Sequence, residues 1–298
     1  MEKMKNKILK VLKNLTRAFN IRRGNIYSKF SQVDFVGAFG NRSLSDSGPY
    51  IASVQKALRS YKNFTKFKLD PRYQAILEHC SQEQGKAYLE IIKTESPALI
   101  TKIDIFKEND FIGGATTYEY IDIGAISPST LRYLKVTSDI INIFGETLGD
   151  RIAEIGVGYG GQLLIADKVL KFKQYDLFDL PPVLTLTSKY IESHTLNAAY
   201  LTTSLNQHRG DVEYDLVISN YAFSELPSKL QLRYIKKILS KSKRGYLTMN
   251  SGKVNSVFKE DKLSLADLKK HLPVFEILEE KPLTATDNYI IVWGRKAI

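Results

Sequence analysis

The chain has few of the features that mark disulfide-stapled, zinc-binding or membrane-spanning proteins. Its 298 residues include a single cysteine, Cys80, so no disulfide can close within the chain. No stretch reaches the roughly 18 consecutive apolar residues that a membrane-spanning helix needs. Four scattered histidines and one cysteine offer no zinc-ligand spacing, so no metal is predicted, although a magnesium site made only of acids stays open.

The composition is that of a globular protein with a nearly neutral body. Hydrophobic residues make up 43% of the chain and charged residues 25%, which suits one large domain or two modest ones. The net charge of +11 is concentrated at the start, because residues 1–30 hold nine Lys or Arg and one acid. The other 268 residues hold 34 bases and 31 acids, a net charge of +3. We therefore predict no nucleic-acid partner.

Residues 1–30 form a basic amphipathic segment. Lysines are interleaved with apolar residues at helical spacing, namely Met1, Met4, Ile8, Val11, Leu12, Leu15 and Phe19. The lysines interrupt the apolar centre of a signal peptide, so the sequence predicts a cytoplasmic protein. Two interpretations stay open. Residues 1–24 bind an anionic lipid surface, at the inner face of the membrane, or the helix packs on the body or on a partner subunit. The oligomeric state is also open.

Two regions follow, a mainly helical one over residues 31–145 and an alternating one over residues 146–298. The helical region shows no strong strand alternation, and we interpret it as a cap that binds substrate. In the second region, apolar runs at 151–156, 173–179, 199–204, 214–219 and 243–249 predict strands with helices between them. This alternation is typical of parallel strands joined by crossover helices. The closing runs PVFEILEE and NYIIVWG are expected to be antiparallel to each other, which makes an α/β fold with seven strands.

A glycine-rich turn follows the first predicted strand. The string EIGVGYGGQ places Glu154 at the end of a buried strand and Gly156, Gly158 and Gly160 directly after it. Glycines let the backbone turn sharply and approach a ligand, which predicts a nucleotide-like cofactor. A buried carboxylate needs a cationic partner, and the ammonium of S-adenosylmethionine (SAM) supplies one, whereas nicotinamide nucleotides do not. The turn also fits GxGxxG if Gly161 is counted, so a nicotinamide-dependent oxidoreductase stays as an alternative.

Two acids lie in the string YDLFDLPP, which ends the second strand. An acid at the exit of this strand, about 20 residues after the glycines, can accept both hydroxyl protons of a ribose. Asp179 lies at the exit, where a ligand can reach it, and the prolines after it restrict the turn. Asp179 is therefore the predicted ribose ligand, and Asp176 is the competitor.

Taken together, these strings resemble one family. EIGVGYGGQ, YDLFDLP and DLVISNYAFSELP look like the class I SAM-dependent methyltransferases, and specifically like the sugar O-methyltransferase family. The resemblance covers roughly residues 105–298 and includes ISPSTLRYLKV at 126–136 and GYLTMN at 245–250. It implies a Rossmann-like sheet of seven strands with an antiparallel last strand. It also implies transfer of a methyl group from SAM to a sugar hydroxyl on a nucleotide sugar, a glycan or a lipid-linked saccharide.

The resemblance also implies which residues bind the cofactor. Asn220, at the exit of the fourth strand, is expected to face the methionine end of SAM, and Ser204, after the third strand, to contact adenine. The full implied set is Glu154, Gly156, Gly158, Gly160, Gln162, Asp179, Ser204 and Asn220.

The general base is not carried over by the resemblance. Plant-type O-methyltransferases place a catalytic histidine after the fourth strand, where this chain has Ser224 and Glu225. Glu225 is our leading candidate, because Tyr221 and Glu225 are four residues apart and would share one face of a helix. Asp110, in NDFIGG, is the alternative base, and its other interpretation is an ordinary turn acid.

Arg132 and Tyr133 are the predicted substrate-binding residues. They lie in STLRY, about one helix before the first strand, and Arg132 could grip an acidic sugar or the cofactor carboxylate through paired hydrogen bonds. An interdomain salt bridge is the other interpretation of Arg132. An RNA methyltransferase stays as a second alternative function, although the NPPY-like string typical of base-nitrogen methylation is replaced by residues 220–223, NYAF.

Overall fold

The computed structural model describes residues 48–250 and 262–295 of the chain. The predicted basic helix over residues 1–30 lies outside the described residues, as do residues 31–47 of the predicted helical region.

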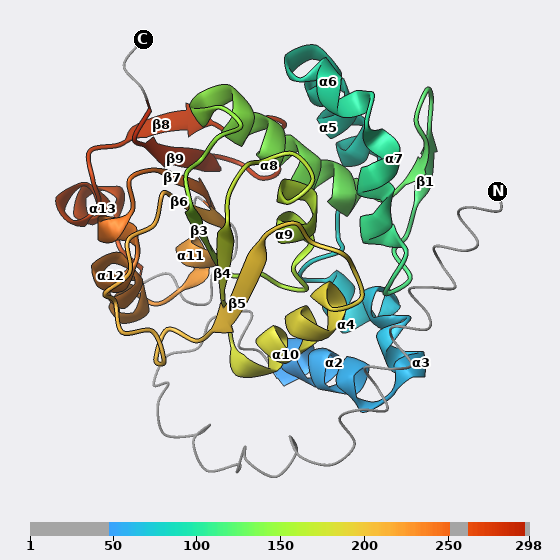
Figure 1. The fold of residues 1–298 in the computed structure, drawn as a ribbon, viewed down its shortest axis with the longest axis horizontal. Coiled ribbons are helices and arrows are strands. Elements are labelled where there is room, and N and C mark those ends of the chain that lie inside the picture. The colour runs from blue at the N-terminus through green and yellow to red at the C-terminus, as the bar shows by residue number, and fades with distance from the viewer. Residues whose placement is uncertain (1–47, 251–261, 296–298) are drawn as a thin grey trace.

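A seven-stranded sheet forms the centre of the molecule, in the order β5-β4-β3-β6-β7-β9-β8 (Figure 1). Its strands are β3 (Arg151–Ile155), β4 (Gln174–Phe178), β5 (Ala199–Thr203), β6 (Leu216–Asn220), β7 (Gly245–Met249), β8 (Glu276–Glu279) and β9 (Tyr289–Trp293). Strands β3 to β7 pair in parallel, and β9 is antiparallel to both β7 and β8. The predicted α/β, Rossmann-like class with an antiparallel last strand is confirmed.

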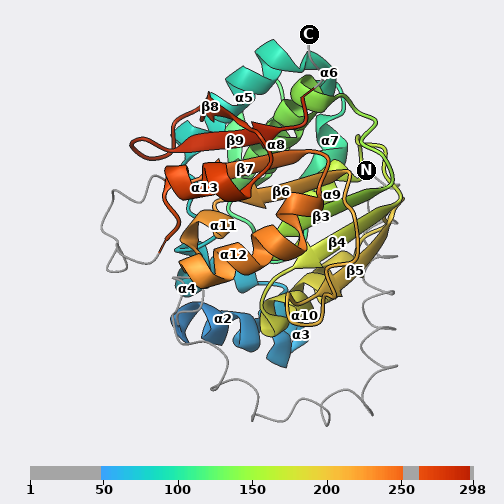
Figure 2. The same cartoon turned by 90° about the vertical axis from the view of Figure 1, so that its left-hand side faces the viewer.

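Helices cover both faces of the sheet (Figures 1 and 2). One face carries α8 (Pro128–Phe144), α9 (Gly161–Ala166) and α10 (Pro181–Ile191), and the other carries α11 (Ala222–Glu225), α12 (Ser228–Lys237), η5 (Leu239–Lys241) and α13 (Leu265–His271). Side chains alternate along β3, so Ile152 belongs to the apolar cluster on the α8 face and Ile155 to the cluster on the α12 face. This burial on both faces explains why the central strands are continuous apolar runs.

The helical region packs outside α8 and α10. Its elements are α2 (Gly48–Arg59), α3 (Tyr61–Phe64), η3 (Phe67–Leu69), α4 (Pro71–Gln74), α5 (Gln82–Glu95), α6 (Pro97–Ile100), α7 (Ile103–Phe106) and η4 (Lys107–Asp110). Helix α5 lies against α8, and α2 lies against α10. One apolar cluster runs from Tyr50 in α2 to Val292 in β9, across the predicted boundary near residue 145. The division into regions there stays a prediction.

A short hairpin in the helical region was not expected from the sequence. Strands β1 (Tyr118–Tyr120) and β2 (Gly124–Ile126) pair antiparallel, and Asp122 between them has a φ of 77°. Strands of three residues are too short for alternation to stand out, which is why periodicity did not reveal them.

The order of the strands places a crevice at the carboxyl end of β3. From β3 the chain builds β4 and β5 on one side, then returns to build β6 and β7 on the other. Ligands of open α/β sheets bind where the order reverses in this way. Strand β8 runs in the same direction as β7, because both are antiparallel to β9. The loop after β8 therefore reaches the same edge of the sheet.

Candidate active site

The glycine turn between β3 and α9 is packed tightly. Gly156 has a φ of +79°, and a Cβ there would lie 2.0 Å from the Cβ of Ala222 in α11. Gly158 has a φ of +54°, and a Cβ would lie 2.8 Å from Cδ1 of Leu77 in the helical region. Gly160, with a φ of 90°, directly precedes α9. Positive φ and close neighbours both exclude larger residues here.

Asp179 holds this turn from the exit of β4. Its Oδ2 accepts hydrogen bonds from the amides of Val157 at 2.9 Å and Gly158 at 3.2 Å, and its Oδ1 accepts one from the amide of Leu180 at 2.7 Å. The structure therefore brings the predicted ribose ligand into direct contact with the predicted glycine motif. Its role toward ribose stays a prediction.

Asp176 lies elsewhere. Its carboxylate accepts hydrogen bonds from Tyr214 Oη at 3.0 Å and Gln174 Nε2 at 2.9 Å, and it forms an ion pair with Arg151 at 3.3 Å. These partners satisfy a side chain that is 2% exposed and belongs to the α12 face of the sheet. Asp176 thus stabilises the sheet, and the preference for Asp179 as the acid at the crevice agrees with the geometry.

Glu154 is a buried carboxyl group beside the turn. It is 2% exposed, and Tyr175 Oη donates a hydrogen bond to its Oε2 at 2.9 Å. Burial, with a smaller contribution from the charge of Asp179, raises the pKa of Glu154 to about 8, and the Tyr175 hydrogen bond opposes this rise. In the free protein at pH 7 the group is therefore mainly protonated, and a cation arriving beside it would favour its ionisation.

A chain of hydrogen bonds orients Asn220 at the exit of β6. Gln162 Nε2 donates to the carbonyl of Tyr133 at 3.2 Å and to Thr137 Oγ1 at 2.9 Å, so its Oε1 faces Asn220 and accepts from Asn220 Nδ2 at 3.3 Å. Asn220 Oδ1 is left buried with no hydrogen-bond partner. A buried acceptor of this kind is expensive unless a ligand supplies a donor.

The side chains of Arg132 and Tyr133 lie in different places. Arg132 is 8% exposed, donates from Nη2 to the carbonyl of Leu77 at 3.2 Å, and has a buried Nε with no partner. Tyr133 instead packs against the glycine turn, since a Cβ on Gly161 would lie 2.6 Å from its Cε2. Of the two predicted substrate-binding residues, only Arg132 lines the cavity beside Asn220.

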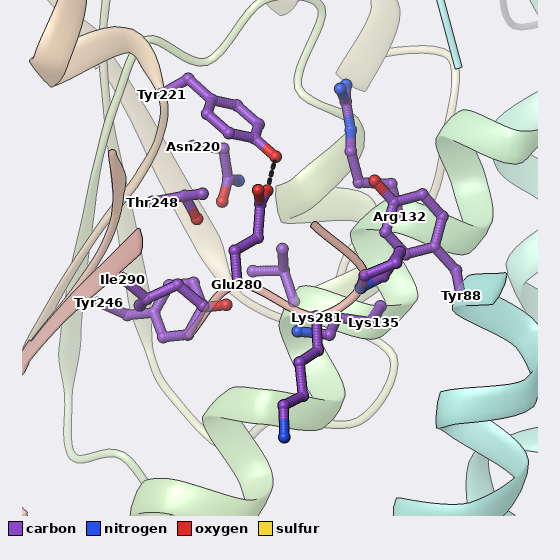
Figure 3. Close-up of a pocket in the computed structure, with 12 residues that line it drawn as sticks. Tyr88, Arg132, Lys135, Asn220, Tyr221, Tyr246, Thr248, Glu280, Lys281 and Ile290 are labelled. Atoms are coloured by element: carbon purple, nitrogen blue, oxygen red, sulfur yellow. Dashed lines mark hydrogen bonds between the residues drawn. The ribbon is translucent and has the colours of Figure 1, made fainter. Parts of the chain in front are cut away.

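This cavity lies between α5, α8, the ends of β6 and β7 and the loop after β8 (Figure 3). It has a volume of about 20 Å³, room for about one water molecule. Aromatic and charged side chains line it, including Tyr88, Arg132, Lys135, Tyr221, Tyr246 and Glu280. Figure 3 shows Glu280 and Tyr221 pointing toward each other, with Asn220 beside them.

The predicted pairing of Tyr221 with Glu225 on one helix face is wrong. Tyr221 precedes α11 with a φ of 66°, so it does not continue the helix, and its hydroxyl donates to Glu280. Glu225 lies on a different side of the turn, where Asn250 Nδ2 donates to its Oε1 at 3.0 Å. Burial raises the pKa of Glu225, and nearby Lys262 opposes this rise. Glu225 is not among the residues that line the cavity.

Asp110 caps the start of α8. Its Oδ1 accepts from Ser127 Oγ at 2.6 Å and Thr130 Oγ1 at 2.7 Å, and its Oδ2 accepts from the Ser127 amide at 2.7 Å. These contacts support the turn-acid interpretation of Asp110. Ser204, at the exit of β5, follows the residue that pairs with Phe178 in β4, so it lies beside Asp179 at the sheet edge. Its Oγ donates to Gln207 Oε1 at 3.0 Å.

Sequence reasoning missed the cavity residues Tyr88, Lys135, Tyr246 and Glu280. Glu280 carried a usable signal, because it ends the predicted strand PVFEILEE, and the topology brings that strand's exit to the edge where Asn220 lies. Tyr88 and Lys135 carried none, since each is one polar residue on an amphipathic helix.

Two classes of feature are absent from the described residues. Within 48–250 and 262–295, no three His, Cys, Asp or Glu side chains are placed to hold a metal ion. No helix in that part of the chain is both long and apolar enough to cross a membrane.

Comparison with known proteins gives only weak likenesses. No protein-family model and no curated protein matches the sequence. One similar solved structure is the N-terminal domain of EvdMO1 in the presence of SAH and D-fucose, with 13% identity and a TM-score of 0.42 over 66% of this chain and 94% of that chain. Another is a SAM-dependent methyltransferase from Clostridium acetobutylicum ATCC 824, with 12% identity and a TM-score of 0.42 over 54% and 89% of the two chains.

A third is an rRNA methylase from Streptococcus thermophilus, with 17% identity and a TM-score of 0.39 over 54% of this chain and 93% of that chain. Likenesses at this level carry no argument about activity or substrate. The functional assignment of this protein therefore rests on its own residues.

Proposed function

We propose that the protein is a SAM-dependent O-methyltransferase that methylates a sugar hydroxyl. The observation that carries the proposal is Asn220 Oδ1, a buried acceptor without a partner at the crevice of the sheet. It lies at the exit of β6, the strand beside β3, whose own exit leads into the glycine turn held by Asp179. A hydrogen-bond donor is what this position lacks, and the ammonium of SAM would supply one.

The residues present fit SAM. Asn220 Oδ1 would accept a hydrogen bond from the ammonium of its amino-acid end, and Glu154 would supply the compensating negative charge. Arg132 Nε, a buried donor without a partner, suits the cofactor carboxylate. Asp179 would bind the ribose hydroxyls and Ser204 would lie on the adenine side. When bound, SAM supplies a methyl group on a positively charged sulfur.

The cavity lining favours a polyhydroxylated acceptor. Tyrosine rings from α5, the exit of β6 and β7 surround Thr248 and Glu280, and this mixture of aromatic faces and hydrogen-bonding groups suits a sugar. A sugar is larger than the cavity, so the cavity must widen before an acceptor binds. Most of the rate enhancement would come from holding the acceptor oxygen in line with the methyl group.

The test begins with calorimetry of the full chain against SAM, SAH and NADH. We expect binding of SAM and SAH and none of NADH, and the reverse pattern would instead establish the nicotinamide alternative. Asn220→Ala should weaken SAM binding about tenfold, for one lost hydrogen bond to a charged group. The control is Asn142→Ala, an exposed position near the end of α8, which should bind SAM like the wild type.

The acceptor is then sought by measuring SAH release with UDP-glucose, GDP-mannose, free oligosaccharides and RNA. Turnover with a saccharide supports the proposal. SAM binding with turnover on RNA alone would establish a methyltransferase of the other class and refute the sugar acceptor.

A further inference from the structure

We infer that Glu280 is the catalytic residue that takes the proton from the acceptor hydroxyl, with Tyr221 and Thr284 as positioning residues. The inference rests on the proposed function and adds to it the general base, which the sequence motifs did not supply.

Glu280 is a buried carboxylate held by its own loop. It is 5% exposed and directly follows β8. The amide of Thr284 donates to its Oε2 at 2.9 Å, and the hydroxyl of Thr284 lies 2.9 Å from Oε1 and 2.8 Å from Oε2. Asn288 Nδ2 in turn donates to Thr284 Oγ1 at 3.1 Å. A side chain fixed in this way needs little reorganisation before it accepts a proton.

Glu280 lies at the place where the acceptor must react. It lines the same small cavity as Asn220, the residue assigned to the methionine end of SAM (Figure 3). The methyl group is attached to that end of the cofactor, so an acceptor oxygen aligned with it comes within reach of the residues of this cavity. The topology explains the proximity, because β8 and β6 both point their carboxyl ends at this edge.

Tyr221 orients Glu280 from the opposite wall. Its hydroxyl donates to Glu280 Oε1, and its amide donates to the carbonyl of Thr248 at 2.9 Å. The backbone of Tyr221 has a φ of 66°, a conformation that costs about 1–3 kcal/mol in a residue other than glycine and persists only where the surroundings enforce it. Burial first, and the charge of Glu280 second, hold the pKa of Tyr221 far above its usual value. The proton of this hydrogen bond therefore stays on Tyr221.

The two other candidate bases are committed to different tasks. Asp110 holds the start of α8 and is not among the residues that line the cavity. Glu225 is bound by Asn250 and faces Lys262 rather than the cavity. Of the acids in the described parts of the chain, Glu280 is the one that lines the cavity.

The reaction balances with this one base. The acceptor oxygen forms a bond to the methyl carbon, and the carbon–sulfur bond breaks with its electron pair going to sulfur. The hydroxyl proton passes to the Glu280 carboxylate and then to solvent when the product leaves. A positioned base typically contributes a factor of about 10² to 10⁴ in rate.

Charged and titratable groups surround Glu280. Tyr88 faces it from α5 and Arg132 from α8, and Lys281 follows it in its own loop. Lys135 and Tyr246, on the far side of the cavity, are both bound by Asp139. Because the hydroxyl of Tyr221 orients Glu280, Tyr221→Phe should lower kcat while the Kd of SAM and the KM of the acceptor stay unchanged. Loss of packing alone would not separate kcat from KM in this way.

The experiment compares Glu280→Gln with Glu279→Gln in the full chain. Glutamine keeps the shape of the side chain but cannot accept the proton, so kcat with SAM and the best saccharide found should fall about 10² to 10⁴-fold. The Kd of SAM should stay within about twofold, since the base is not assigned a cofactor contact. Glu279 is exposed and carries the same charge one residue earlier, so Glu279→Gln should keep wild-type kcat.

The outcomes separate the two proposals. If the wild type does not bind SAM, the proposed function itself fails. If it binds SAM and turns over, and Glu280→Gln keeps wild-type kcat while Glu225→Gln loses it, the assignment of Glu280 is overturned and the proposed function stands.

Discussion

Asp179 offers the sharpest test of how the crevice is built, because its carboxylate holds the glycine turn and is also proposed to bind ribose. Replacement by alanine removes both tasks. The backbone amides of Val157 and Gly158 lose the partner that they have at 2.9 and 3.2 Å, and the amide of Leu180 loses one at 2.7 Å. The predicted ribose acceptor disappears at the same time.

The size of the effect follows from these bonds. The amides of Val157 and Gly158 are buried, and leaving each without an acceptor costs about 1–3 kcal/mol, so Asp179→Ala should lower the free energy of unfolding by about 2–6 kcal/mol. That corresponds to a fall in Tm of roughly 3–10 °C for a chain of 298 residues. Loss of a charge-assisted bond to ribose, about 1.5–3 kcal/mol, should weaken SAH binding by a further factor of about 10 to 150.

Calorimetry with SAH and thermal unfolding measure the two effects separately. Asp176→Asn is the matched control, because Asp176 is bound by Tyr214, Gln174 and Arg151 away from the turn. It should lower Tm while the folded protein binds SAH with wild-type affinity. Wild-type SAH affinity in Asp179→Ala would refute the reasoning, and so would an equal loss of affinity in both variants.

Three other predictions concern the buried acid, the turn and the basic segment. Burial raises the pKa of Glu154 from 4.5 to about 8, so SAM binding at pH 7 should release up to one proton from this group. The binding enthalpy should therefore differ between phosphate and Tris buffers in the wild type but not in Glu154→Gln. In the free protein the same shift makes Glu154 favour folding most at low pH, and this contribution is lost as the pH rises from 4.5 through about 8. Gly156→Ala combines a positive φ with a Cβ 2.0 Å from Ala222, so it should lower the free energy of unfolding in urea by about 2–5 kcal/mol. Gly145 also has a positive φ but has open space around it, so Gly145→Ala should lower it by only about 1–2 kcal/mol. Equal losses in the two variants would show that the contact with Ala222 is irrelevant. Deletion of residues 1–24 should abolish co-sedimentation with anionic vesicles, and a full-length protein that never sediments would support the packing interpretation.

The sequence determined the fold class and the main elements of the crevice at the end of β3. Alternating apolar runs predicted the parallel strands, because a strand buried on both faces must be apolar throughout. Gly156 and Asp179 were predicted from local constraints. A turn at positive φ needs glycine, and the position of an acid at the end of a strand can be recognised from the residues next to it. These features depend on short stretches of chain, and short stretches can be interpreted without the rest.

Only the tertiary structure decided which groups face the cavity beside Asn220. Tyr221 turns away from Glu225 because its backbone leaves the helix, a conformation that the spacing of four residues could not reveal. It meets Glu280, 59 positions later in the chain, through the arrangement of β6 and β8 in one sheet. The unpaired oxygen of Asn220 depends likewise on Gln162 and on two groups of α8. Contacts between distant segments are set by strand order and side-chain packing together, and no single stretch of the sequence determines either one.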